Sequence, residues 1–148
     1  MTVYSATIEW KRQTQTFDYK TYNREHHWRF ANGMSIDASA APEYLGKESC
    51  LDPEESFVAT LSSCHMLFFL AIASMKGFTI DSYIDKAVGT LEKNANGKLA
   101  MTKVVLKPQI TFTGDKKPSV EDINHMHEKA HKECFIANSV NTEISIEL

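Results

Sequence analysis

The chain has 148 residues, of which 43% are hydrophobic and 24% are charged, and its formal net charge is -3. This length fits one domain over residues 1–148, and the small negative charge excludes a basic field for binding nucleic acid. No signal-like segment follows Met1, and the longest apolar run is short of the ~20 residues that span a bilayer. We therefore expect a cytoplasmic protein that is not embedded in a membrane.

The N-terminal part is predicted to form three strands. Apolar and polar residues alternate over residues 4–10, which is the pattern of a half-buried strand. The Asn32-Gly33 pair is a strong turn signal, and it predicts a hairpin between residues 28–30 and residues 34–38.

A long helix is predicted next. Asp52 can cap it, Pro53 suits the first helical position, and Gly77 marks its end. Residues 64–73 are nearly all apolar, so this helix has no face to leave in water and must be covered on all sides. One sheet cannot do this, so we expect a homodimer in which the long helices pack together.

The remaining elements complete an α+β order. Residues 78–93 and 98–113 are predicted as two strands joined by a turn at 94–97, and residues 140–148 as the final strand. Ser119 and Asp122 form a capping-box pattern for a second helix. The predicted order is βββ-α-ββ-α-β, with antiparallel sheets packed on the long central helix.

The three cysteines suggest reduced thiols rather than a secreted disulfide framework. Cys50 lies in a loop and is treated as incidental. Cys64 lies in the apolar part of the long helix, and Cys134 falls on one stripe of the second helix with Ile123, His127 and Ala130. Each fits a packing thiol, yet two inward cysteines on separate helices also fit a redox couple, and spacing does not decide between these.

A zinc site is the rival hypothesis. His127, His131 and Cys134 share one face of the second helix, and together with Cys64 they could supply four ligands. The segment HEKAH also satisfies the H-E-x-x-H pattern through Glu128. A solvated, histidine-rich face is the simpler interpretation, and we prefer it.

A reactive Cys64 needs a nearby cation, because a cation favours the thiolate while burial disfavours it. Arg24, His26 and His27 are candidates from the N-terminal part. His65 follows Cys64 directly and points about a hundred degrees away on a helix, so it is expected to be a hydrogen-bonded core or interface histidine. Glu54 either favours the helix dipole or pairs with an arginine.

Two segments resemble the OsmC/Ohr family. DPEESFVATLSSC resembles the stretch in which a Pro-Glu pair opens the central helix and the reactive cysteine follows ten residues after the glutamate, here Glu54 and Cys64. HKECFIANSV resembles the region of the second cysteine, here Cys134. The order of elements agrees over essentially the whole chain, and SSCHM resembles the OsmC-like branch.

The resemblance implies an intertwined homodimer with two sites at the subunit interface, acting as a thiol peroxidase on organic hydroperoxides or hydrogen peroxide. It implies that Cys64 is the peroxidatic cysteine and that Cys134 resolves its sulfenic acid as a disulfide. A dithiol, such as the dihydrolipoyl group of a lipoylated protein, would then reduce the pair, and no metal or organic cofactor is expected.

The resemblance also implies an arginine that stabilises the thiolate and is oriented by Glu54. Arg24 matches best because it lies just ahead of the hairpin, and Arg12 and Arg29 are the alternatives. The surrounding TYNREHHW departs from the glycine-flanked arginine of Ohr proteins, so a dimeric stress or binding protein without turnover is a further alternative.

Overall fold

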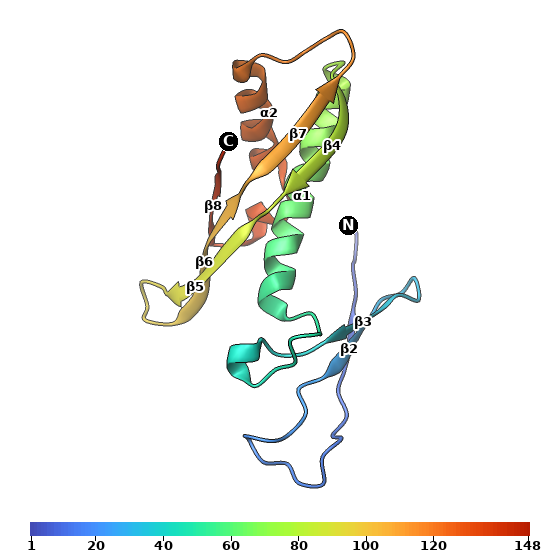
Figure 1. The fold of residues 1–148 in the computed structure, drawn as a ribbon, viewed down its shortest axis with the longest axis vertical. Helices are drawn as coiled ribbons and strands as arrows, with labels where there is room; N and C mark the ends of the chain where they lie inside the picture. The colour runs from blue at the N-terminus through green and yellow to red at the C-terminus, as the bar shows by residue number, and fades with distance from the viewer. The chain divides into compact units, whose positions relative to one another are not determined.

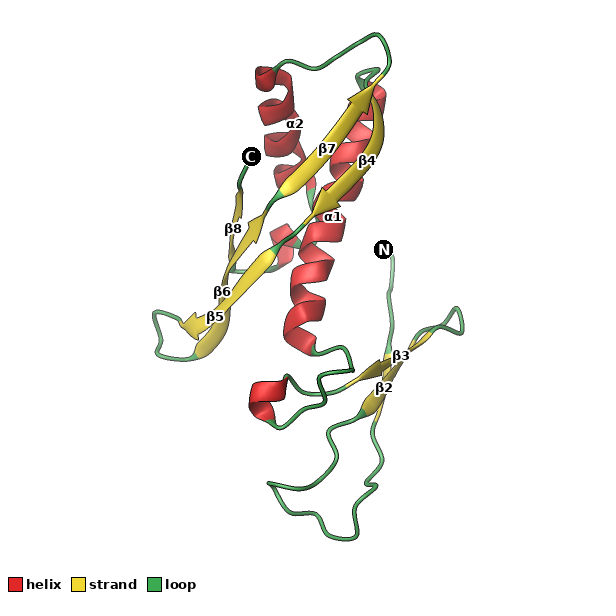
Figure 2. Cartoon of the chain, in the orientation of Figure 1, coloured by secondary structure: helices red, strands yellow, loops and turns green.

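The computed structural model describes residues 1–148 and contains two compact units, Met1–Ser56 and Phe57–Leu148. Figure 2 shows that the chain contains both helices and strands, and runs of strands are separated along the chain by the two long helices, as in an α+β protein. The α+β fold class is confirmed. A single domain over all 148 residues stays a prediction.

The first unit contains a three-stranded antiparallel sheet in the order β1-β2-β3. Its strands are β1 (Thr7–Glu9), β2 (His26–Arg29) and β3 (Ser35–Ala38). Gly33 has φ of 86°, a conformation that glycine adopts without strain, and the hairpin predicted around it is confirmed. A short 3-10 helix, η1 (Pro42–Tyr44), follows the sheet.

Helix α1 (Pro53–Met75) begins and ends where the sequence predicts. The carboxylate of Asp52 accepts a hydrogen bond from the backbone N–H of Glu55 at 2.8 Å, so Asp52 caps the first turn. Gly77 has φ of 81°, and the N–H groups of Gly77 and Phe78 donate to the carbonyls of Ser74 and Ala73. These two bonds form a Schellman motif, which satisfies the last carbonyls of the helix.

The second unit contains two sheets, and neither of the two long strands predicted between the helices is continuous. Strand β4 (Thr79–Asp85) pairs antiparallel with β7 (Pro108–Thr113). Strand β5 (Val88–Lys93) pairs antiparallel with β6 (Leu99–Leu106), which pairs in parallel with β8 (Glu143–Ile146). Each long strand predicted between the helices is therefore two strands, and each pair of strands divides between the two sheets.

Asp85 accounts for the division. Its Oδ1 accepts a hydrogen bond from the backbone N–H of Lys107 at 2.6 Å, where a continuous ladder would have used a backbone carbonyl. Pro108 has no N–H to donate, and it stands at the first position of β7, where a proline is tolerated. The alternation of hydrophobic and polar residues in the sequence does not indicate where a strand changes its pairing partner.

Helix α2 (Val120–Glu133) runs alongside α1 in Figure 1. Its predicted capping box is confirmed, because Ser119 and Asp122 exchange side-chain-to-backbone hydrogen bonds. One core cluster joins the two helices through the buried residues Phe69, Ile72, Ala73, Phe78, Met126 and Ala130, and the β4-β7 sheet packs against it through Ile80, Tyr83, Ile110 and Phe112. A second joins the earlier turns of α1 to β6 through Leu61, Val104 and Leu106.

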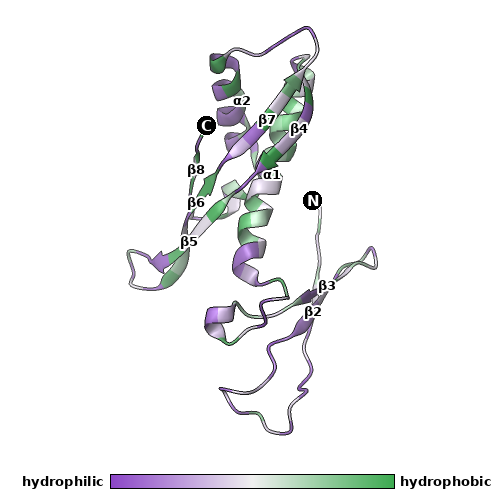
Figure 3. Cartoon of the chain, in the orientation of Figure 1, coloured by the Kyte–Doolittle hydropathy of each residue, from purple (hydrophilic) through white to green (hydrophobic).

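Only one side of α1 is covered within the chain. The buried side chains are one stripe, namely Leu61, His65, Phe69, Ile72 and Ala73, whereas Leu67 is 60% exposed. Figure 3 shows that α1 turns from hydrophilic to hydrophobic along its length. The homodimer inferred from this apolar helix stays a prediction.

The expectation about membrane-spanning length was wrong. The 23 residues of α1 include an 18-residue window of mean hydropathy 1.8, so length and composition alone would allow this helix to cross a membrane. The core helix of a soluble protein passes the same test, and the Ser and Thr side chains that interrupt the apolar run do not lower the average enough to fail it.

Gly89 allows β5 to lie directly against α1. A Cβ at this position would stand 2.4 Å from Val58 Cγ2 and 2.6 Å from Met101 Cε. We expect Gly89→Ala to reduce the free energy of unfolding by roughly 1–3 kcal/mol in urea denaturation, the usual cost of overpacking. Thr90→Val, at the exposed neighbouring position, is the control and should change it by less than about 0.5 kcal/mol. An unchanged midpoint for Gly89→Ala would contradict the close packing.

Candidate functional site

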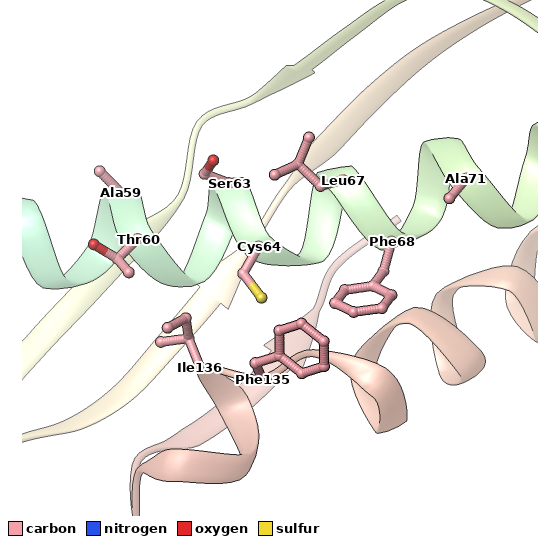
Figure 4. Close-up of a pocket in the computed structure, with 9 residues that line it drawn as sticks. All are labelled: Ala59, Thr60, Ser63, Cys64, Leu67, Phe68, Ala71, Phe135 and Ile136. Carbon is pink, nitrogen blue, oxygen red and sulfur yellow. The ribbon is translucent and has the colours of Figure 1, made fainter. Parts of the chain in front are cut away.

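An apolar groove runs along α1 around Cys64. Its volume is about 670 Å³, and its lining consists of Ala59, Thr60, Ser63, Cys64, Leu67, Phe68, Ala71, Phe135 and Ile136. Figure 4 shows the Cys64 sulfur pointing from the helix toward the turn that carries Phe135 and Ile136. Cys64 is half-buried and lines the groove.

Two neighbouring rows of helical side chains form the floor of the groove. Residues four apart lie above one another on a helix, and Thr60, Cys64 and Phe68 make one such row. The wall comes from the segment that follows α2, where the ring of Phe135 meets the ring of Phe68 edge-on at 5.0 Å between centroids. This aromatic contact fixes the wall beside Cys64.

Cys134 lies at the C-terminal end of α2 and is only 1% exposed. Its backbone N–H donates to the Ala130 carbonyl at 3.0 Å, and its sulfur accepts from the N–H of Ala137 at 3.4 Å. Burial, together with the neighbouring Cys64 thiol, raises the pKa of the Cys134 thiol to about 11. The structure therefore places the two inward cysteines near each other, and both are free thiols.

The three candidate arginines are all in the first unit and have local partners. The Arg24 guanidinium stacks 3.6 Å from the ring centroid of Tyr22, and its Nη1 donates to the Tyr22 carbonyl at 2.7 Å. Arg12 binds backbone carbonyls in its own loop, and Arg29 lies 3.6 Å from a carboxylate oxygen of Glu9.

Glu54 is in the first turn of α1, and its Oε2 is buried with no hydrogen-bond partner. It forms no ion pair with Arg24 within the chain, because Arg24 donates to the carbonyls of Tyr19 and Tyr22 instead. The roles implied for Arg24 and Glu54 stay predictions.

A buried histidine pair was not anticipated. His65 Nε2 lies 2.9 Å from His127 Nδ1, and the two side chains are 1% and 2% exposed. The expectation of a hydrogen-bonded core histidine at His65 is confirmed, whereas the preferred interpretation of His127 as part of a solvated face was wrong. Helical periodicity could have predicted the burial of His127, because His127 lies on the same stripe of α2 as Ala130 and Cys134. Residues on one stripe of a helix face the same surroundings, so a stripe that buries Cys134 also buries His127.

The zinc hypothesis lacks its donor geometry. No three His, Cys, Asp or Glu side chains of the chain are grouped as metal ligands. His127 directs Nδ1 to His65, and Glu128 of the HEKAH segment is exposed on another face of α2. The four donors proposed, His127, His131, Cys134 and Cys64, are therefore not gathered into one ligand set in this structure.

Comparisons with known proteins agree with the fold. The family described as OsmC-like protein matches residues 46–148. An OsmC-like protein of unknown function from Vibrio cholerae is 49% identical, with a TM-score of 0.96 and 99% of each chain covered. Among curated protein sequences, none matches.

More distant structures share the fold. An organic hydroperoxide resistance protein OsmC from Legionella pneumophila is 17% identical, with a TM-score of 0.69 and 100% of both chains covered. An organic hydroperoxide resistance protein from Elizabethkingia anophelis is 18% identical, with a TM-score of 0.70, and the match covers 99% of this chain and 97% of that one. With the family match over most of the chain and a relative of nearly half-identical sequence, this protein belongs to the OsmC-like family.

Proposed function

We propose that this protein is a cysteine-based peroxidase that reduces organic hydroperoxides, with Cys64 as the attacking thiolate and Cys134 as the resolving thiol. The observation that carries the proposal is the proximity of Cys64, in the lining of an apolar groove, to Cys134. Family membership supports a role in stress or peroxide defence.

The groove favours an organic substrate. Its lining is almost entirely carbon, and only Thr60, Ser63 and Cys64 among its nine residues carry a polar side-chain atom. An alkyl or aryl group of a hydroperoxide would gain free energy by leaving water for this surface, at roughly 25 cal/mol per Å² of apolar area. Hydrogen peroxide has no such group and would gain nothing there.

The first step oxidises Cys64. Its thiolate sulfur attacks the terminal oxygen of the hydroperoxide, the O–O bond breaks, and the alkoxide leaves and takes a proton to become the alcohol. Cys64 is now a sulfenic acid, oxidised by two electrons.

The second step forms a disulfide between Cys64 and Cys134. The Cys134 sulfur attacks the sulfenic sulfur, the S–S bond forms, and the S–O bond breaks. Hydroxide leaves with the proton of the Cys134 thiol, so the product is water. A dithiol, for which a lipoylated protein is one source, then returns both cysteines to thiols by two exchanges and is itself oxidised to a disulfide.

The proposal gives Arg24 and Glu54 supporting roles. The unpartnered Oε2 of Glu54 can accept from a guanidinium, and an arginine held there would favour the thiolate form of a cysteine. A second copy of this chain would cover the exposed side of α1, where Leu67 is 60% exposed. Three free thiols fit a reducing compartment, for which we propose the cytoplasm.

Cys64→Ser should abolish peroxide consumption, since a serine hydroxyl cannot form a sulfenic acid. We expect the second-order rate constant with cumene hydroperoxide, measured by stopped flow, to fall at least about a thousandfold. Cys50→Ser is the matched control and should keep the rate within about twofold. Equal rates for Cys64→Ser and the unsubstituted protein would remove Cys64 from the mechanism and would favour a binding protein without turnover.

Cys134→Ser should separate the two steps. The first equivalent of peroxide should still be consumed, because Cys64 is intact, and the sulfenic acid should then persist or oxidise further. Intact-mass spectrometry after one equivalent should show a gain of one oxygen in this variant, and a loss of two hydrogens in the unsubstituted protein. A Cys64–Cys50 disulfide in the unsubstituted protein would instead make Cys50 the resolving residue.

Leu67→Ser should change substrate preference. Leu67 lines the groove, so its loss should lower kcat/KM for cumene hydroperoxide about three- to tenfold and leave kcat/KM for hydrogen peroxide nearly unchanged. Met75→Ser, an exposed apolar residue of the same helix outside the groove, is the control. Equal losses for both peroxides would mean that the groove does not hold the organic part of the substrate.

A further inference from the structure

The buried His65–His127 hydrogen bond ties α1 to α2 beside the two cysteines. The two rings lie nearly parallel, at an angle of 8°, and Nε2 of His65 faces Nδ1 of His127 at 2.9 Å. The ring of Phe69 packs against His127 at 4.3 Å between centroids and shields the bond from water. This is a cross-link between helices in which both partners can change charge.

Only one proton fits between the facing nitrogens. In the neutral pair, one nitrogen donates and the other accepts. If both rings became cations, both facing nitrogens would carry N–H, so the bond would be lost and replaced by repulsion. The outer nitrogens, His65 Nδ1 and His127 Nε2, are buried with no hydrogen-bond partner. Protonation of the donating ring would therefore leave an outer N–H without an acceptor, and protonation of the accepting ring would set two N–H groups against each other.

The surrounding charges act on His65 in opposite directions. His131 on α2 opposes a charge on His65, whereas Asp85 on β4 favours one. Asp85 is already engaged by the Ser62 hydroxyl and the Lys107 N–H. Tyr83, also on β4, has a buried hydroxyl without a partner, and β7 carries no titratable side chain.

Burial therefore lowers the pKa of His65 and of His127 from 6.5 to about 4. A state in which the pair has opened to water would bind protons with the ordinary histidine pKa. Between pH 6.5 and about 4 the open state thus takes up more protons than the closed state, so the closed pair is favoured above this window and loses stability as the pH falls through it.

The pair and the cysteines share the same two helices. His65 follows Cys64 on α1, and His127 lies seven residues before Cys134, which is about two turns or roughly 10 Å along α2. Ala130 lies between them on the buried stripe. Moving this part of α2 away from α1 would carry Cys134 away from Cys64.

We propose that His65 and His127 are positioning residues that hold Cys134 against Cys64, and that their protonation at acidic pH opens this part of the α1–α2 contact and separates the two thiols. The consequence for disulfide formation rests on the proposed function. The opening itself is a property of the reduced protein.

The opening can be measured without peroxide. Reduced full-length protein carrying Cys50→Ser and Cys64→Ser, in which Cys134 is the only thiol and has no labelled neighbour with which to form a disulfide, would be treated with 4,4′-dithiodipyridine between about pH 7.5 and pH 4.5, and labelling of Cys134 followed by peptide mass spectrometry. Rates would be divided by those of the denatured chain at the same pH, which removes the pH dependence of the thiol itself. We expect protection of Cys134 to fall at least about tenfold across this range while far-UV circular dichroism keeps its helical signal.

Glutamine replaces the titrating groups and keeps hydrogen-bonding ability. In His127→Gln and in His65→Gln, protection of Cys134 should lose most of its pH dependence, whereas His125→Gln, at an exposed position of α2, should behave like the unsubstituted protein. The same pH dependence in the two glutamine variants and in the control overturns the proposal, as does protection that is constant in the unsubstituted protein.

Ring NMR signals test the unsubstituted protein even if both glutamine variants fail to fold. The midpoint of the loss of protection should coincide with titration of the His65 and His127 rings, and a difference of more than about one pH unit overturns the proposal. Mass spectrometry of the unsubstituted protein after one equivalent of cumene hydroperoxide then tests the proposed peroxidase activity separately. A protein that forms no sulfenic acid or disulfide at any pH refutes the peroxidase, while the labelling result still decides the inference about the histidines.

Discussion

The packing of α2 against α1 is the contact on which the rest of the site depends. The stripe of α2 that faces α1 carries His127, Ala130 and Cys134, all at most 2% exposed. Ala130 is small enough for the helices to approach closely, so one turn can place an imidazole against His65 and a later turn a thiol against Cys64. The β4-β7 sheet holds this arrangement from one side through the cluster around Phe69. A change in the contact between α1 and α2 therefore affects both the His65–His127 pair and the Cys64–Cys134 pair.

Features of the fold that depend on a few neighbouring residues were predictable from the sequence. The cap at Asp52, the Schellman end at Gly77 and the capping box of Ser119 are local, so composition and spacing suffice to find them. The division of the strands between two sheets was not predictable, because it depends on Asp85 meeting Lys107 across the fold. Pro108, next to Lys107, indicates an edge or a bulge there, but nothing in the sequence identifies Asp85 as the group that accepts the ladder bond.

The same distinction applies to the site. The position of Cys134 on an inward stripe follows from helical periodicity, so its burial was predictable, and its contact with Cys64 needed only the packing of two helices. His127 was misjudged because histidines clustered in sequence resemble a solvated face, although the periodicity that buries Cys134 buries it as well. The partners of Arg24 are carbonyls of an irregular loop, and irregular backbone has no periodicity from which such contacts could be read.

Burial also sets the order in which the two thiols would react in the proposed cycle. Cys64 lies half-buried in the groove, where a peroxide can reach it, whereas Cys134 is 1% exposed and its pKa is raised to about 11. A thiol that is both protonated and enclosed is a poor target for peroxide from solution, because the thiolate is the nucleophile. Cys134 would therefore react only after Cys64 has become a sulfenic acid. Because the two sulfurs lie near each other, the effective concentration of the sulfenic acid at Cys134 would be high, and this would compensate for the weak nucleophilicity of a protonated thiol. The asymmetry that would make Cys64 the first thiol to react in the proposed cycle is thus a consequence of where α2 ends, since the same stripe that closes the core also encloses the second sulfur.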